Sequence, residues 1–308
     1  MPSPLVSVVV ATYNRSNVLR YAIETVRWQT LTDWELIVVG DACTDDTAEV
    51  VASFHDDRVR FHDLERNVGE QSGPNSEGVR LSRGAYVAFL NHDDLWLPNH
   101  LELCIDHLRT TSADLVFSLM CVVNRDGPNA LACVTPTGRY EPYIGVPASS
   151  WVFRRECGSD VGSWRLSRGC YASPSQDWLL RARRAGKDLR QLPRLTVVAI
   201  QSGCRPGSYA SRESAEHAEY FARLSDPRAF VEAECAALAN SHAVRDPRLG
   251  ANLDVVVYAR RAIRNVVRRL ALAFGIPPAS LFLLLRHGRK GGFIAHLRRV
   301  RGLPAARG

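Results

Sequence analysis

Residues 6–47 read VSVVVATYNRSNVLRYAIETVRWQTLTDWELIVVGDACTDDT, and this stretch decides the fold class. Residues 5–12 are a nearly continuous β-branched run that ends at a polar corner, which is typical of a buried strand. Apolar or small residues then recur at helical spacing across 17–29, and a second apolar run at 34–39 is followed by Asp41. The stretch therefore predicts a strand, a helix and a second strand.

The same alternation continues beyond this stretch. The pattern predicts a helix at 45–54, a strand at 59–62, a helix at 75–83 and a strand at 85–90. Strands that alternate with helices indicate a parallel sheet, buried on both faces, whose functional groups gather at the carboxyl ends of the strands. Since Tyr13, Asp41, Asp93 and Asp94 each follow such an end, we expect them to line one crevice.

Composition excludes several classes of protein. A chain of 308 residues with 46% hydrophobic content can bury a large core, so disorder is not expected. Its eight cysteines form no CxxC pair, which argues against a zinc ribbon or redox motif and favours reduced, buried thiols. The apolar run near the N-terminus is short and has no basic leader, so we expect a cytoplasmic protein without a signal peptide.

The positive charge is concentrated in the last part of the chain. Residues 255–308 contain twelve Lys and Arg and no Asp or Glu, whereas residues 1–254 carry 27 basic and 32 acidic residues. No nucleic-acid recognition module accompanies this charge, so no nucleic acid is expected as a partner. Gly275 and two prolines interrupt the longest apolar run, so a membrane-spanning helix is not expected.

Two interpretations of residues 255–308 stay open at this point. Basic residues that alternate with apolar ones suit an interfacial helix that contacts anionic lipid at the inner face of the membrane. The same pattern suits a helix that docks on the preceding domain or on a partner chain.

Three separated motifs resemble family 2 glycosyltransferases. They are the opening stretch 6–47, FLNHDDLW at 89–96, which resembles the family's DXD-type metal motif, and SQDWLLRARRAG at 175–186, which resembles the segment with the catalytic base. The resemblance covers about residues 5–200 and implies the nucleotide-diphospho-sugar transferase (GT-A) fold. That fold is α/β and Rossmann-like, with a mostly parallel sheet flanked by helices.

This resemblance, together with the composition, predicts the domain organisation. The GT-A-like domain is expected at 1–203, with a donor half at about 1–100 and an acceptor half at about 101–203. A helical segment at 204–254 and the basic, helical C-terminal extension at 255–308 should follow. In the acceptor half, Trp164 could pack against a sugar or simply belong to the core.

The resemblance also implies the roles of individual residues. Donor binding is expected from Thr12, Tyr13, Asp41, Asn75 and Asp93. Asp94 is expected to bind Mg²⁺ or Mn²⁺, which would neutralise the departing phosphate, and Asp177 is expected to act as general base in an inverting transfer. The donor would be a nucleotide-diphospho-sugar, with uridine favoured, and the acceptor a glycan or lipid-linked hydroxyl group.

The chain departs from the family pattern at four places, namely Gly40, Asn75, Asn91 and Gln176, where the family often has an acid, Arg, Asp and Glu. The change at Asn75 removes a positive charge expected near the donor diphosphate. His92, His100 and His217 are more often structural than ligating in such settings, so they are not included among the expected ligands.

Each assignment has a simpler alternative. Asp93 and Asp94 could only cap the helix expected near Pro98, and Asp177 could only be an acid favourable at a helix N-terminus. Three other functions compete: a sugar-nucleotide-forming nucleotidyltransferase, a catalytically inactive donor-binding module, and a membrane-surface scaffold acting through 255–308. The first would need a glycine-rich phosphate loop that the first corner lacks, and the retained acids favour the glycosyltransferase.

Overall fold

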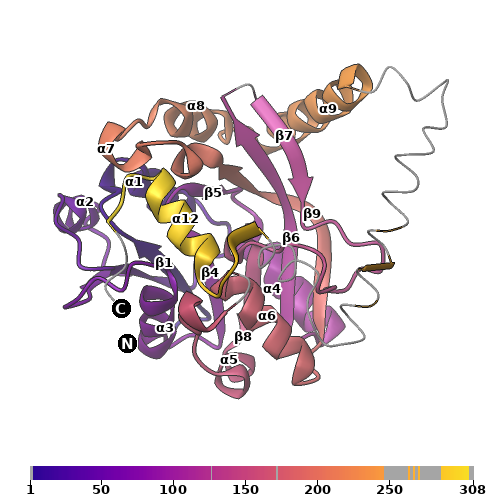
Figure 1. Cartoon of the computed structure of the whole chain (residues 1–308), viewed down its shortest axis with the longest axis horizontal. Coiled ribbons are helices and arrows are strands. Elements are labelled where there is room, and N and C mark those ends of the chain that lie inside the picture. Colours follow the sequence, from indigo (N-terminus) through magenta and orange to yellow (C-terminus); the bar gives the residue numbers. More distant parts are fainter. Residues whose placement is uncertain are drawn as a thin grey trace.

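A computed structural model describes residues 3–125, 127–170, 173–245 and 286–304, together with the isolated positions 263, 266, 267 and 270. The predicted extension 255–308 therefore lies largely outside the described residues, and only its last part can be followed in Figure 1.

One mixed, nine-stranded sheet forms the centre of the described molecule (Figure 1). Its strands are β1 (Val6–Thr12), β2 (Trp34–Gly40), β3 (Val59–Asp63), β4 (Tyr86–Asn91), β5 (Asp94–Trp96), β6 (Leu115–Asn124), β7 (Gly127–Ala132), β8 (Trp151–Arg154) and β9 (Leu189–Ile200). Along the sheet the order is β3-β2-β1-β4-β8-β6-β9-β5, and β7 pairs with β6. The strands predicted at 5–12, 34–39, 59–62 and 85–90 are confirmed.

The first four strands are parallel, whereas the rest of the sheet is mixed. β1 pairs with both β2 and β4 in parallel, so that Thr12 lies beside Gly40 and Ala11 lies beside Asn91. β8 runs antiparallel to both β4 and β6, which ends the purely parallel region. The carboxyl ends of β1, β2 and β4 therefore meet at one edge, as the sequence predicts for the donor half.

Helices cover the sheet and extend beyond it (Figure 1). They are α1 (Ser16–Arg27), α2 (Thr47–Ala52), α3 (Ser72–Leu81), α4 (His100–Thr111), α5 (Arg155–Val161), α6 (Pro174–Arg184), α7 (Ser208–Ser211), α8 (Ala215–Arg223), α9 (Pro227–Arg245) and α12 (Gly292–Val300). The predicted helices of the donor half are confirmed to within a few residues, and α7 to α9 confirm helical structure after Gly203. α3 packs closely on β1, because a Cβ at Gly78 would lie only 2.2 Å from Cγ1 of Val9.

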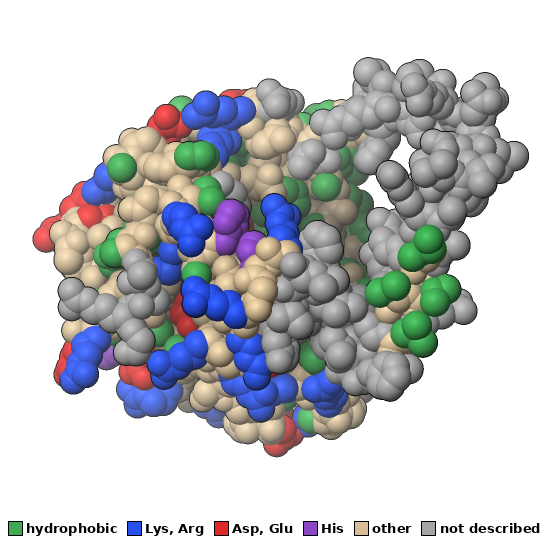
Figure 2. All heavy atoms as spheres, viewed as in Figure 1, with side chains coloured by type: hydrophobic (Ala, Val, Ile, Leu, Met, Phe, Trp, Pro, Cys, Tyr) green, Lys and Arg blue, Asp and Glu red, His purple; other side chains and the backbone are tan. Residues whose placement is uncertain are grey.

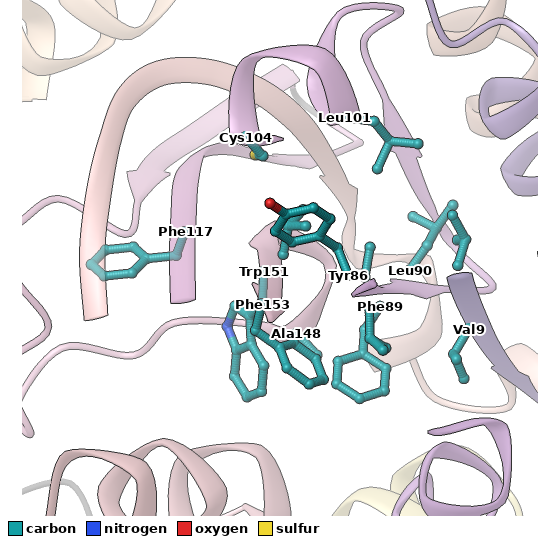
Figure 3. Close-up of a cluster of buried hydrophobic side chains, with 14 of the residues drawn as sticks. Val9, Tyr86, Phe89, Leu90, Leu101, Cys104, Phe117, Ala148, Trp151 and Phe153 are labelled. Carbon is teal, nitrogen blue, oxygen red and sulfur yellow. The ribbon is translucent and has the colours of Figure 1, made fainter. Parts of the chain in front are cut away.

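Aromatic side chains dominate the core between the sheet and α6. The ring centroid of Phe89 lies 5.6 Å from that of Phe153 and 5.1 Å from that of Trp164, and Trp151 lies 5.7 Å from Trp178. Figure 3 shows Phe89, Trp151 and Phe153 packed together below Tyr86. Trp164 is therefore a core residue, and the alternative that places it against a sugar is not supported by its position.

A buried carboxylate joins three segments at the amino-terminal edge of the parallel strands. Glu35 is 2% exposed and accepts hydrogen bonds from Oγ of Ser7 at 2.7 Å and from the backbone N–H of Arg83 at 2.8 Å. The guanidinium groups of Arg60 and Arg83 each lie 2.8 Å from its Oε2. Burial alone would raise the pKa of Glu35, but these hydrogen bonds outweigh burial and hold the pKa below its usual value.

We expect Glu35→Ala to lower the free energy of unfolding by about 3 kcal/mol, because the hydroxyl group of Ser7 and the backbone N–H of Arg83 lose their acceptor. Urea titration at neutral pH measures this change. Since the folded pKa of Glu35 is depressed, the difference from wild type should shrink as the pH falls below 4.5. The control Glu24→Ala removes a surface ion pair with Arg27 and should cost less than about 1 kcal/mol. Equal effects of the two changes would contradict the role of Glu35.

Candidate functional site

A cavity of about 210 Å³ lies at the carboxyl ends of β1, β2 and β4. Four of the predicted donor-site residues line it, namely Thr12, Tyr13, Asp41 and Asp93. They come from the ends of three strands, and the parallel register of these strands brings them together. Of the four residues expected to share one crevice, Tyr13, Asp41 and Asp93 line this cavity, whereas Asp94 does not.

Thr12 and Tyr13 form the part of the cavity that follows β1. Thr12 is 3% exposed, and its Oγ1 has no hydrogen-bond partner among the described residues. Tyr13 is half-buried, and its ring centroid lies 6.4 Å from that of Tyr209, which also lines the cavity. The cavity thus has two aromatic rings beside an unpaired hydroxyl group, a surface suited to a planar base and a ribose.

Asp41 fixes the loop that forms the next part of the wall. Its carboxylate accepts hydrogen bonds from the backbone N–H groups of Val68 and Gly69, both at 2.7 Å. Burial raises the pKa of Asp41, while these two bonds oppose the rise. Because a carboxylate can accept about four hydrogen bonds, Asp41 can still accept a donor from a ligand.

The adjacent acids Asp93 and Asp94 have different surroundings. Asp93 lines the cavity, whereas Asp94 begins β5 and its Oδ2 accepts hydrogen bonds from Oγ of Ser149 and from Nδ2 of Asn91. Asp93 lies in the turn that follows β4, whereas Asp94 is the first residue of β5, so the two side chains have different neighbours. The sequence predicts Asp94 as the metal ligand and Asp93 as a contact of the ribose. In the structure, however, Asp93 is the acid that lines the cavity, so its position favours Asp93 over Asp94 as the metal ligand.

The charges of the two acids are coupled. Burial, followed by repulsion from Asp93, raises the pKa of Asp94 to about 7. Burial opposes ionisation of Asp93 as well, but electrostatic interactions with His92, Arg15, Arg301 and His217 outweigh burial and lower the pKa of Asp93. Asp93 is thus the acid that stays ionised most readily.

The three histidines near these acids have separate surroundings. His92 lines the cavity, and burial lowers its pKa to about 4, so that it is neutral at pH 7. Nδ1 of His100 is 2.7 Å from Oγ1 of Thr196 and its ring stacks on Trp96, which makes His100 structural. Nε2 of His217 lies 3.1 Å from the backbone oxygen of Asp93 and can support the acidic loop from behind.

Asn75 and Asp177 are not among the residues that line the cavity. Asn75 is 3% exposed within α3, and its neighbour Pro74 reaches the cavity instead. The carboxylate of Asp177 lies 3.0 Å from Nε of Arg181 and 3.8 Å from Nη1 of Arg165. Ser173, which precedes α6, does line the cavity, so Asp177 lies in the first turn of a helix that starts there. Their expected roles stay predictions.

The roof of the cavity comes from α12 and the residues after it, which the sequence did not indicate as part of the site. The residues of this segment that line the cavity are Phe293, Ile294, Leu297, Arg298, Arg301 and Leu303. Figure 2, drawn in the view of Figure 1, shows Lys and Arg side chains gathered on the face where α12 lies. The signal was the alternation of apolar and basic residues in this part of the chain.

Docking on the preceding domain is thus confirmed for residues 286–304, while membrane contact through the rest of 255–308 falls outside the described residues. In the part of the chain that the structure covers, no helix combines the length and apolar character needed to cross a membrane.

A divalent cation fits the site only with help from a ligand. Among the described residues, no three His, Cys, Asp or Glu side chains converge as a ready-made metal cage. Mg²⁺ is nevertheless commonly held by one or two carboxylates together with substrate phosphates. Asp93, which lines the cavity, with Asp94 buried next to it in the chain, is consistent with that kind of sparse site.

The first part of the chain is similar to a known protein family. The family described as Glycosyl transferase family 2 matches residues 7–130. An uncharacterized protein of Sinorhizobium fredii, y4gI, is 30% identical over 220 residues, which are 69% of this chain and 24% of that protein.

Two further comparisons concern proteins whose names state an activity or a bound ligand. The Escherichia coli UDP-Glc:alpha-D-GlcNAc-diphosphoundecaprenol beta-1,3-glucosyltransferase WfgD is 29% identical over 126 residues, 41% of this chain and 49% of its own length. The chain thus spans half or less of the length of these curated relatives. The crystal structure of S. aureus TarS in complex with UDP-GlcNAc superposes with a TM-score of 0.56 at 18% identity, covering 96% of this chain and 90% of that one. This likeness shows a shared fold.

We expect Asp94→Asn to stabilise the metal-free protein by at least about 1 kcal/mol at pH 8, because it removes a charge whose ionisation the fold opposes. The pKa of Asp94 in the folded protein, about 7, lies above the usual 3.8. The contribution of protonated Asp94 to the stability of the wild-type protein is therefore lost as the pH rises from 3.8 to about 7. Thermal unfolding from pH 4 to pH 8 in the presence of a chelator measures the difference, which should vanish near pH 4. The surface change Asp106→Asn serves as control. A wild-type protein as stable as Asp94→Asn at pH 8 would refute the coupling.

Proposed function

The chain belongs to glycosyltransferase family 2 and has its GT-A fold, and from this premise we propose that it moves a sugar from a nucleotide-diphospho-sugar to an acceptor hydroxyl group, with inversion at the anomeric carbon. One observation carries the proposal. Thr12, Tyr13, Asp41 and Asp93, which are distant in sequence, converge on one cavity at the carboxyl ends of parallel strands. This is the part of an α/β sheet where nucleotides bind.

In this proposal the nucleoside lies between β1 and β2. The ring of Tyr13 packs on the base, and Asp41 accepts a hydrogen bond from it. The bonds from Val68 and Gly69 hold the Asp41 carboxylate in one orientation, so that little entropy is lost when a base binds. Thr12 offers its unpaired hydroxyl group to the same ligand.

The Asp93–Asp94 pair holds the divalent cation, Mg²⁺ or Mn²⁺, in this proposal. Asp93 reaches the cavity directly, while Asp94 lies one residue behind it and is oriented by Ser149 and Asn91. When bound, the cation neutralises charge that develops on the departing phosphate. Asp93 also remains placed to contact the ribose, as the family resemblance implies.

Asp177 is the proposed general base. It takes the proton from the acceptor hydroxyl group as that oxygen attacks the anomeric carbon, and the nucleoside diphosphate leaves from the opposite face. Nε of the neighbouring Arg181 lies 3.0 Å from Oδ2 of Asp177 and orients its carboxylate.

A UDP-sugar donor and a glycan or lipid-linked acceptor are the proposed substrates, which makes the protein an enzyme of glycan biosynthesis. This proposal is supported by two similar proteins: TarS was crystallised with UDP-GlcNAc, and the name of WfgD gives UDP-Glc and a diphosphoundecaprenol-linked sugar as its substrates. Such an acceptor would place the enzyme in the cytoplasm at the inner face of the membrane.

A catalytically inactive donor-binding module is the second candidate. The position of Asp177, which is paired with Arg181 and Arg165 and does not line the cavity, favours it. This candidate predicts donor binding without turnover.

We expect Asp177→Asn to lower the rate at which water hydrolyses the bound donor by roughly 10²- to 10⁴-fold. Donor affinity should not change, because Asp177 acts only on the proton of the attacking hydroxyl group or water. The assay uses UDP-, dTDP- and GDP-sugars with Mg²⁺ or Mn²⁺, calorimetry for binding, and detection of the released nucleoside diphosphate. Asp106→Asn, an acid exposed on α4, is the matched control.

Two results would count against these assignments. Binding of a donor without turnover by the wild-type protein would support the inactive module. Absence of binding to every donor, with and without metal, would contradict the proposed function itself.

A further inference from the structure

The cavity has an unfavourable charge for a diphosphate unless α12 is in place. Three acids line it, namely Asp41, Glu70 and Asp93. Among the described residues that line it, the two Lys or Arg side chains are Arg298 and Arg301, both from the last segment. A ligand with two or three negative charges would be repelled by the strand ends alone.

The donor half does not replace this charge from within. Asn75 occupies the place where the family often has Arg, and it is buried in α3 away from the cavity. Arg15, which is 1% exposed, donates to the backbone oxygen of Ser208 at 2.6 Å and to Oγ of Ser202 at 3.2 Å. Arg15 therefore supports the wall from outside rather than lining the cavity.

Arg301 is positioned beside the acid that reaches the cavity. Its Nε donates to the backbone oxygen of Gly203 at 2.8 Å. A Cβ on Gly203 would lie 2.6 Å from Oδ2 of Asp93 and 3.9 Å from Nη2 of Arg301, so both groups flank the same glycine. The guanidinium also lies 5.8 Å from the ring centre of Tyr209, which limits the orientations open to it.

Arg298 has a different task, which is to hold α12 in place. It is 6% exposed; its Nη1 donates to the backbone oxygen of Gly69 at 2.5 Å and its Nε to that of Pro304 at 2.8 Å. Gly69 belongs to the loop that Asp41 fixes through a backbone N–H. The roof is thus anchored to the wall of the nucleoside site, with Arg301 one helical turn beyond the anchor.

We propose that Arg301 binds the diphosphate of the donor, so that the C-terminal segment 292–303 supplies the positive charge missing from the donor half. This inference rests on the proposed function, since it assigns a diphosphate to the cavity. A guanidinium can donate two parallel hydrogen bonds to phosphate oxygens, which a lysine cannot do in the same geometry. Because Asp93 and Arg301 both lie beside Gly203, the diphosphate would contact Arg301 next to the cation-binding acids.

The test compares nucleoside diphosphates with the matching nucleosides in the full chain. UDP, dTDP and GDP, and uridine, thymidine and guanosine, are titrated in Mg²⁺ by calorimetry, with inorganic pyrophosphate as competitor. We expect Arg301→Gln to weaken the best diphosphate by about 10- to 100-fold and to leave the nucleoside unchanged. Arg301→Lys should recover part of the loss, and Arg299→Gln, an equal charge change at an exposed position of α12, should have no effect.

The outcomes separate this inference from the proposed function. If the wild-type chain binds none of these compounds, the proposed function fails and the inference with it. If the wild type binds a diphosphate and Arg301→Gln binds it equally well, only the inference fails. Equal weakening of diphosphate and nucleoside would show that Arg301 merely maintains the shape of the cavity, and would overturn the inference too. Weakened competition by pyrophosphate in Arg301→Gln, with native melting behaviour, would support it.

Discussion

The parallel pairing of β1 with β2 and β4 is the constraint on which the candidate site depends. Its register sets Thr12 beside Gly40 and Ala11 beside Asn91, so the corners that follow these strands open on the same edge. The strands are buried on both faces and offer no polar surface along their length. A slip of one residue would turn buried side chains to the opposite face, so the packing that stabilises the sheet also fixes the position of the site.

Much of the donor half could be predicted from the sequence, because its signals are local. Thr12, Tyr13, Asp41 and Asp93 each follow an apolar run that could only be a strand, and a parallel sheet places such residues at one edge. Side-chain direction was less predictable. Asp94 turns to Ser149 because it starts β5, and Asp177 pairs with Arg181 one helical turn away, and neither direction is determined by the motif.

The contribution of α12 to the cavity could not have been predicted, because the alternation of basic and apolar residues in 255–308 is compatible with two structures. An apolar face with basic groups can lie on anionic lipid or cover an acidic cavity, and the sequence of 292–303 suits both. Long-range contacts, such as those of Arg298 with Gly69 and of Arg301 with Gly203, decide between them for this segment. The mixed part of the sheet escaped prediction for a similar reason, since the pairing of β8 with both β4 and β6 joins segments that are distant in sequence.

The position of α12 also sets an order of events during folding. The sheet that forms the floor and walls of the cavity is complete by Ile200, whereas the anchor of the roof is Arg298. Because domains fold as their residues leave the ribosome, the floor can form while the roof is still unsynthesised. Bringing Arg298 back to the sheet costs chain entropy that the docking contacts must offset. The newly made chain would therefore pass through a stage with a finished sheet and an open, acidic cavity.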